Sequence, residues 1–196
     1  MRVEARFARI RGTKSHRHHL WGRPLTPHTT GTRSGLSRLN ALPRPSLERE
    51  LHGCLGVNRW SRDVADRQPY DTVDELRTVA DEAARTLTSG EVDEALSGHP
   101  RIGERPEGPN ASASRTEQAG VDRQDRELAD ALYEGNVAYE ERFGHIFLIC
   151  ASELSGEEIL TQLRARLAND AETERRVVAD ELRKITLLRV ERLLAP

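Results

Sequence analysis

Residues 72–87, with the sequence TVDELRTVADEAARTL, decide the fold class of this chain. Thr72 and Glu75 have the spacing of a capping box, in which both side chains satisfy free N–H groups at the start of a helix. Behind them apolar residues recur every three or four positions, as on one face of a helix: Val73, Leu76, Val79, Ala80, Ala83, Ala84 and Leu87. This pattern predicts an amphipathic helix that ends at Ser89-Gly90.

The same pattern extends over the chain from Leu36 onward. Further helices are predicted from Ser46 to Leu55 and onward past Trp60, from Gly90 to Gly98, over 125–143, behind Ser155-Gly156-Glu157-Glu158, and over 171–194. Only residues 145–151 have a composition suited to a strand, and that segment is short. We therefore expect an all-α fold with a single compact multi-helix domain and no internal repeat.

Length and composition narrow the functional class. The chain has 196 residues, enough for one good core, with 36% hydrophobic and 32% charged residues. No apolar run has the length needed to cross a bilayer, which argues against a membrane span. Its two cysteines, Cys54 and Cys150, form no CxxC pair, so zinc and redox motifs have no support. These features predict a cytoplasmic protein without a metal.

Charge is distributed unevenly along the chain. Residues 1–34 contain eight Lys or Arg and one acid, Glu4, whereas residues 35–196 contain 22 basic and 31 acidic residues. The N-terminal segment has few large apolar residues and cannot bury a core of its own. A nucleic-acid arm, a transit peptide and a metal-binding tract are conceivable, but a disordered extension or a start codon placed too early is favoured. The helical domain is therefore expected over residues 35–196.

A histidine in an irregular segment is the best candidate for chemistry. Gly98-His99-Pro100-Arg101-Ile102-Gly103 interrupts the helices, and Ser114-Arg115-Thr116-Glu117-Gln118 follows at the start of the next one. Histidine exchanges a proton near neutral pH, and Glu and Gln can orient a polar substrate. Residues 98–113 form a long loop between helices, and ordered loops of this kind often have a functional role.

Local pattern alone favours a purely structural interpretation. His99 has the position of an inert loop residue that follows a helix, and Ser114 with Glu117 has the spacing of a capping box. Residues 147–151 are apolar enough to be core, and Arg189 on the last helix is typical of a solvated charge.

A longer set of motifs favours the functional interpretation over the structural one. In order along the chain they are Leu39-Asn40-Ala41-Leu42-Pro43, Arg59-Trp60, Pro69-Tyr70, His99-Pro100-x-x-Gly103, Ser114-x-x-Glu117-Gln118, Asn136-x-x-Tyr139-x-x-Arg142-Phe143-Gly144, Phe147-Leu148-Ile149-Cys150-Ala151, Leu167-x-Asn169-Asp170 and Glu181-Leu182-x-x-Ile185-x-x-Leu188-Arg189. From Leu39 to Leu194 the chain resembles the decarboxylases of 2-oxo-4-hydroxy-4-carboxy-5-ureidoimidazoline (OHCU), a urate-degradation family.

The resemblance implies an all-helical cytoplasmic carboxy-lyase that converts the small molecule OHCU to (S)-allantoin and CO2 without metal or organic cofactor. It implies that His99 and Glu117 are catalytic. The implied substrate-binding residues are Pro100, Ser114, Arg115, Thr116, Gln118, Phe147, Leu148, Ile149, Cys150, Ala151 and Arg189. It suggests a homodimer, although the residues themselves leave the oligomeric state open. Arg101 adds a positive charge beside His99 where some relatives have an acidic or neutral residue, and Glu104 and Arg105 receive no role.

Two other functional classes remain open at this stage. A helical binding module with a basic nucleic-acid-binding arm would bind DNA in a salt-sensitive way that depends on residues 1–34. Another ureido or imidazoline lyase on the same scaffold would have a retuned pocket. Loss of DNA binding on truncation would favour the first, and a substrate panel would identify the second.

Overall fold

The computed structural model describes residues 28–104, 111–121 and 125–195, and within these ranges every regular element is a helix. The helices are α1 (His28–Ala41), α2 (Arg44–Leu55), α3 (Asn58–Ala65), α4 (Val73–Arg85), α5 (Ser89–Ser97), α6 (Ala111–Glu117), α7 (Arg126–Phe143), α8 (Gly156–Arg166) and α9 (Ala171–Leu193). The expected all-α class is confirmed. None of the described helices combines the length and apolar character that crossing a lipid bilayer requires.

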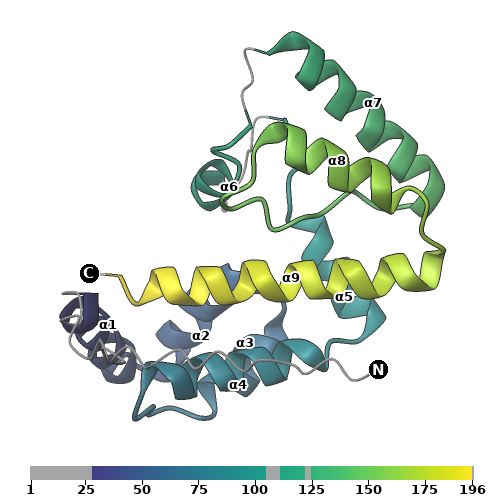
Figure 1. Cartoon of the computed structure of the whole chain (residues 1–196). Coiled ribbons are helices and arrows are strands. Elements are labelled where there is room, and N and C mark those ends of the chain that lie inside the picture. The colour runs from purple at the N-terminus through teal and green to yellow at the C-terminus, as the bar shows by residue number, and fades with distance from the viewer. Residues whose placement is uncertain (1–27, 105–110, 122–124, 196) are drawn as a thin grey trace, which may run out of the picture.

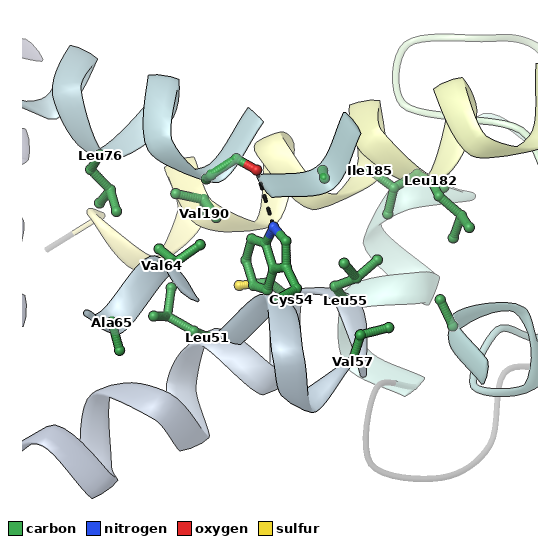
Figure 2. Packing of buried hydrophobic residues seen from close by; sticks show 14 of the residues in the cluster. Leu51, Cys54, Leu55, Val57, Val64, Ala65, Leu76, Leu182, Ile185 and Val190 are labelled. Atoms are coloured by element: carbon green, nitrogen blue, oxygen red, sulfur yellow. Dashed lines mark hydrogen bonds between the residues drawn. The ribbon is translucent and has the colours of Figure 1, made fainter. Parts of the chain in front are cut away.

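The long helix α9 runs through the middle of the molecule, with α2, α3 and α4 on one side and α7 and α8 on the other (Figure 1). Two apolar clusters fill the interior. The first joins α1–α5 to α9 and surrounds Trp60, which is fully buried and donates its indole N–H to the carbonyl of Ala80 at 3.0 Å. Figure 2 shows part of this cluster, with Leu51, Val64 and Val190 converging from three helices.

The second cluster lies between α7, α8 and the segment that joins them. Its centre is the fully buried pair Tyr139 and Phe147, whose rings meet edge to face with centroids 5.2 Å apart. A buried ion pair completes it, because Arg166 binds Glu174 with Nη2–Oε1 at 2.5 Å and both side chains are almost inaccessible. Partnered in this way, the two charges avoid the large penalty of an isolated buried ion.

Several helix boundaries match the sequence-based predictions. Asp125 caps α7 by accepting from the N–H of Leu128, and Ser155 with Glu158 forms the complete capping box of α8. Thr72 accepts from the N–H of Glu75 as expected, but the Glu75 carboxylate accepts from Asp71 instead of from Thr72. The start of each of these helices is thus predictable from local chemistry.

The predicted stop at Ser89-Gly90 is wrong. Helix α4 already ends at Arg85, and Thr88 forms a complete capping box with Glu91 that starts α5 at Ser89. A serine followed by glycine is compatible with a helix end, but the Thr88-x-x-Glu91 spacing satisfies two free N–H groups at once and therefore decides the boundary.

The first helix begins before the expected domain boundary. Helix α1 starts at His28, so residues 28–34 of the expected extension are helical, whereas residues 1–27 lie outside the described residues. Leu36 and Leu39 on α1 are buried in the first cluster, and Gly35 lies so close to the end of α9 that a Cβ there would come within 2.1 Å of the Leu194 carbonyl oxygen. Charge and composition contain no signal for this packing.

Residues 145–151 form no strand among the described residues, and residues 146–151 have no regular secondary structure. Their side chains alternate between the two clusters: Phe147 and Ile149 enter the second cluster, and Leu148 enters the first. Side chains from other elements replace the missing neighbouring strand, because Arg166 donates to the Leu148 carbonyl at 2.7 Å and Glu181 accepts from the Cys150 N–H at 2.8 Å. The segment is thereby held between the two clusters.

The α8 capping box offers a direct test of local stability. Replacing Ser155 with Ala removes the acceptor for the N–H of Glu158, so we expect a loss of about 1 kcal/mol in the free energy of unfolding. Urea unfolding followed by circular dichroism measures this change. Ser37→Ala in α1, an exposed serine inside a helix, serves as control and should leave stability nearly unchanged. Equal stability of both variants would contradict the capping role.

Candidate active site

A small cavity lies where the two apolar clusters meet. It is lined by His99, Pro100, Ile102, Ser114, Glu117, Gln118, Leu148, Ile149, Ala151 and Ile185. Leu148 and Ile185 belong to the first cluster, and Ile102, Ile149 and Ala151 belong to the second. Its volume is about 20 Å³, space for about one water molecule. A larger ligand therefore requires the lining side chains to move apart.

His99 lines this cavity, with one ring nitrogen hydrogen-bonded and the other without a partner among the described residues. Its Nδ1 lies 2.8 Å from the carbonyl oxygen of Ala95, in the last turn of α5. Because a carbonyl oxygen only accepts, the neutral ring has its proton on Nδ1 and a lone pair on Nε2. The Nε2 atom is buried and has no hydrogen-bond partner among the described residues.

Two effects lower the pKa of His99 from its ordinary value of 6.5. Burial disfavours the charged ring first, and the positive charge of Arg189 adds to this, while the hydrogen bond to Ala95 and the charge of Glu117 oppose it. The imidazole is thus neutral near pH 7. In this form Nε2 is a base that faces no donor from the described part of the protein.

Ser114 and Glu117 do not form the predicted capping box. Helix α6 begins at Ala111, so Ser114 lies in its middle and Glu117 is its last residue, and residues 111–113 of the expected loop are helical. Residues 105–110 of that loop lie outside the described residues. Because residues three and four apart share a helix face, Ser114, Glu117 and Gln118 turn together toward the cavity. The buried Oγ of Ser114 has no hydrogen-bond partner within the described ranges.

Gln118 links this helix end to the histidine loop. Its Oε1 accepts from the N–H of Gly103 at 3.3 Å. Gly103 has a φ of +88°, a backbone conformation that residues with a Cβ rarely adopt. The glycine in the His99-Pro100-x-x-Gly103 motif therefore lets the loop turn so that its backbone meets Gln118.

Glu117 is held by two arginines of α9. Arg189 donates to both carboxylate oxygens, Nε to Oε1 and Nη2 to Oε2, each at 2.9 Å, and Arg192 donates from Nη1 to Oε1 at 2.8 Å. Arg189 also donates to the carbonyl of Cys54 at 3.3 Å. Glu117 and Arg189 are both buried, so Arg189 is no solvated charge. With two cations and one anion, the cluster has an excess positive charge beside His99.

Five of the expected substrate-binding residues lie away from the cavity lining, and one of them, Arg189, lines a separate hollow between α2 and α9. Arg115 and Thr116 are not part of the α6 face that lines it, and the Phe147 ring is buried in the second cluster. Cys150 lines a separate hollow beside Lys184. The helical period of α6 explains the positions of Arg115 and Thr116, which are exposed and do not share the face of Ser114 and Glu117.

The charge of Arg101 is neutralised away from His99. Arg101 binds Glu140 at 2.5 Å and Glu104 at 3.1 Å, and it does not line the cavity. The departure from some relatives at this position therefore leaves the surroundings of Nε2 unchanged. Glu104 gains a role as a partner of Arg101.

The structure adds three residues that sequence reasoning did not assign to the site. Ile102 and Ile185 line the cavity, and Arg192 binds Glu117. Spacing contained a signal for two of them, because Ile185, Arg189 and Arg192 follow one another at four and three residues and so share one face of α9.

Neither cysteine is suited to act as a nucleophile here. Burial raises the pKa of the Cys54 thiol to about 12 and also raises that of Cys150. Both are free thiols, and the described residues contain no group of three or more His, Cys, Asp or Glu placed to hold a metal ion. The polar side chains available at the cavity are those of His99, Ser114, Glu117 and Gln118.

Comparison with known proteins gives a consistent result. The sequence model of the OHCU decarboxylase family matches residues 40–191. An OHCU decarboxylase of Haloferax volcanii is 30% identical over 131 residues, which cover 65% of this chain and 78% of that protein. A uric acid degradation bifunctional protein of Arabidopsis thaliana is 30% identical over 153 residues, covering 74% of this chain and 47% of that protein.

A solved structure shows the same fold. It is that of an OHCU decarboxylase crystallised in the presence of (S)-allantoin, and it superposes with a TM-score of 0.64 at 31% sequence identity. The match covers 74% of this chain and 96% of that one. The order of motifs, the matched family and the shared fold agree, and the chain therefore belongs to the OHCU decarboxylase family of carboxy-lyases.

Proposed function

We propose that this protein decarboxylates OHCU to (S)-allantoin and CO2 in uric acid degradation, with His99 and Glu117 as catalytic residues. Family membership supports the reaction. The observation that carries the site assignment is the pair of buried atoms at one cavity, His99 Nε2 and Ser114 Oγ, that lack a partner among the described residues. Buried polar atoms are normally satisfied, so a polar ligand is the natural partner for these two.

The substrate contains its own electron sink. OHCU has a carboxylate on a carbon next to a ring C=N bond. When the bond to the carboxylate breaks, its electron pair moves into the C=N system and CO2 departs. This chemistry needs no organic cofactor or metal from the protein. The protein's task is to orient the carboxylate out of the ring plane, exclude water and direct the protons.

In this proposal His99 transfers a proton. Its neutral Nε2 accepts a hydrogen bond, and then the proton, from the substrate hydroxyl on the carbon that loses CO2. The resulting imidazolium gives this proton to one face of the neighbouring ring carbon, which sets the (S) configuration. A second proton, from solvent, neutralises the ring nitrogen that received the electron pair. The Ala95 carbonyl holds Nδ1–H throughout and stabilises the charged ring in the intermediate stage.

The remaining polar groups bind the substrate's edges. Ser114 Oγ and Gln118 hydrogen-bond its amide and carbonyl groups, and Glu117 accepts from ureido N–H groups. Arg189 lies outside the cavity lining, but the three nitrogens that donate within the protein leave two Nη hydrogens for a substrate oxygen once the lining side chains move apart for the ligand. Leu148, Ile149 and Ala151 keep the reacting groups dry.

The test uses OHCU made in situ from urate by the two upstream enzymes, with the optical rotation of allantoin as readout. The protein should yield (S)-allantoin much faster than the spontaneous reaction, which yields racemate. No acceleration over that background would contradict the proposal. A panel of other ureido and imidazoline substrates in the same assay identifies a retuned lyase.

A truncated protein tests the binding-module alternative. Because α1 begins at His28, the cut belongs before that residue and not at residue 34. The enzyme proposal predicts full activity without residues 1–27, whereas a nucleic-acid module predicts salt-sensitive DNA binding that the cut removes. Gel filtration of the truncated protein tests whether it is a homodimer. We also propose that the enzyme is located in the cytoplasm.

The lowered pKa of His99 predicts the pH profile. Only the neutral ring accepts a proton, so kcat/KM should fall as the pH drops through the pKa of His99, and this acid limb should lie below pH 6.5. Measuring kcat/KM for OHCU between about pH 4.5 and 8, after subtracting the spontaneous reaction, locates this acid limb. An acid limb at or above 6.5 would show that burial and Arg189 do not control this group.

A further inference from the structure

Arg192 is one of the two arginines that bind Glu117, and its side chain is one-third exposed. It follows Arg189 by one helical turn of α9, and its Nη1 reaches Glu117 Oε1 at 2.8 Å. Sequence and family motifs assign it no function. Its contact is nevertheless directed at a residue of the cavity wall, in contrast to the surface ion pairs elsewhere on α9.

The hydrogen bonds of Glu117 are unequal at its two oxygens. Oε1 accepts from both Arg189 and Arg192, whereas Oε2 accepts from Arg189 alone among the described residues. A carboxylate oxygen has two lone pairs in its plane, so Oε1 is filled and Oε2 retains capacity for one more donor. Arg192 thereby decides which oxygen is left for a ligand.

We propose that Arg192 is a positioning residue that acts through Glu117 and presents Oε2 to the substrate. The inference rests on the proposed function, because it gives Glu117 a substrate to bind. Removing Arg192 leaves the two-point bond between Arg189 and Glu117, so the buried carboxylate stays paired but can turn. The free Oε2 is then no longer held toward the ligand.

Arg192 can be truncated with little effect on packing. Its side chain is partly exposed and lines a second hollow of about 240 Å³, between α2 and α9, together with Gly53, Cys54 and Leu193. A shorter side chain therefore extends an open hollow and leaves no closed void. A loss of activity in such a variant reports on the site and not on the core.

The experiment compares Arg192→Ala, Arg192→Lys and a control, Arg176→Ala, in the OHCU assay. Arg176 is an exposed arginine of the same helix that pairs with Glu172 at the other end of α9. Arg192→Ala should lower kcat by at least about tenfold, within the roughly hundredfold that misplacement of a reacting group costs, with a smaller change in KM. Arg192→Lys should restore most of the rate, and Arg176→Ala should match the wild type.

The outcomes separate this inference from the proposed function. Wild-type turnover tests the function, and its absence overturns both. An active wild type with unchanged kcat in Arg192→Ala overturns the positioning role alone. The positioning role is also overturned if the rate and the thermal midpoint fall together and lysine rescues neither, because that pattern is purely structural.

Discussion

His99→Ala is expected to lower kcat for OHCU by about 10²–10⁴-fold and to remove the stereochemical preference of the product. The reason is geometric: Nε2 is the buried base at the cavity, and no other ring nitrogen lines it among the described residues. Optical rotation of the allantoin formed measures both the rate and the handedness. The protein should still fold, because His99 lies in a loop and its ring makes only one hydrogen bond within the described ranges, to Ala95.

His52→Ala is the matched control for this variant. His52 is also partly buried, with a ring nitrogen that lacks a partner in the described structure, but it lies in a groove between α2 and α3, away from the cavity. It should keep the wild-type rate. If His99→Ala retained full rate and (S)-selectivity, or if both variants lost activity equally, His99 would not be the catalytic base.

Glu117→Gln should destabilise the protein by about 3–5 kcal/mol and remove most of its activity. The substitution leaves the buried Arg189 without its counter-charge, and an uncompensated buried ion is among the costliest defects in a fold. Had Glu117 been a helix cap, the loss would be about 1 kcal/mol. Urea unfolding at neutral pH therefore distinguishes the two roles by magnitude.

Two further variants sharpen this test. Glu48→Gln removes a partly exposed partner of Arg44 and should leave stability nearly unchanged, because water screens that pair. The double variant Glu117→Gln with Arg189→Met removes both charges and should recover part of the stability without recovering activity. A small loss for Glu117→Gln alone, equal to that of Glu48→Gln, would contradict the buried-pair account.

Much of the fold was predictable from local chemistry. Helix period and caps such as Asp125 and the Ser155 box depend on residues within one turn, so the chain's own pattern contains them. The ordered motifs also placed His99 and Glu117 in one site, and the structure brings both to one cavity. Whether they are catalytic stays a prediction that the two variants test.

Local chemistry failed where a spacing has two meanings. Ser114-x-x-Glu117 has the same three-residue separation at a helix start and inside a helix, and only the observed start at Ala111 distinguishes them. Residues 145–151 look like a strand, but Arg166 and Glu181 satisfy two of their backbone groups from elsewhere in the chain. Such partners cannot be predicted from the residues that are adjacent in the sequence.

By itself the sequence determined the helical class, most helix boundaries and the family. Only the tertiary structure decided that Arg189 and Arg192 turn inward onto Glu117 and that His99 keeps a neutral ring with one nitrogen left for a ligand. The physical reason is that periodicity and capping act within one helical turn, whereas burial and charge pairing depend on groups 72 to 75 residues apart in the chain.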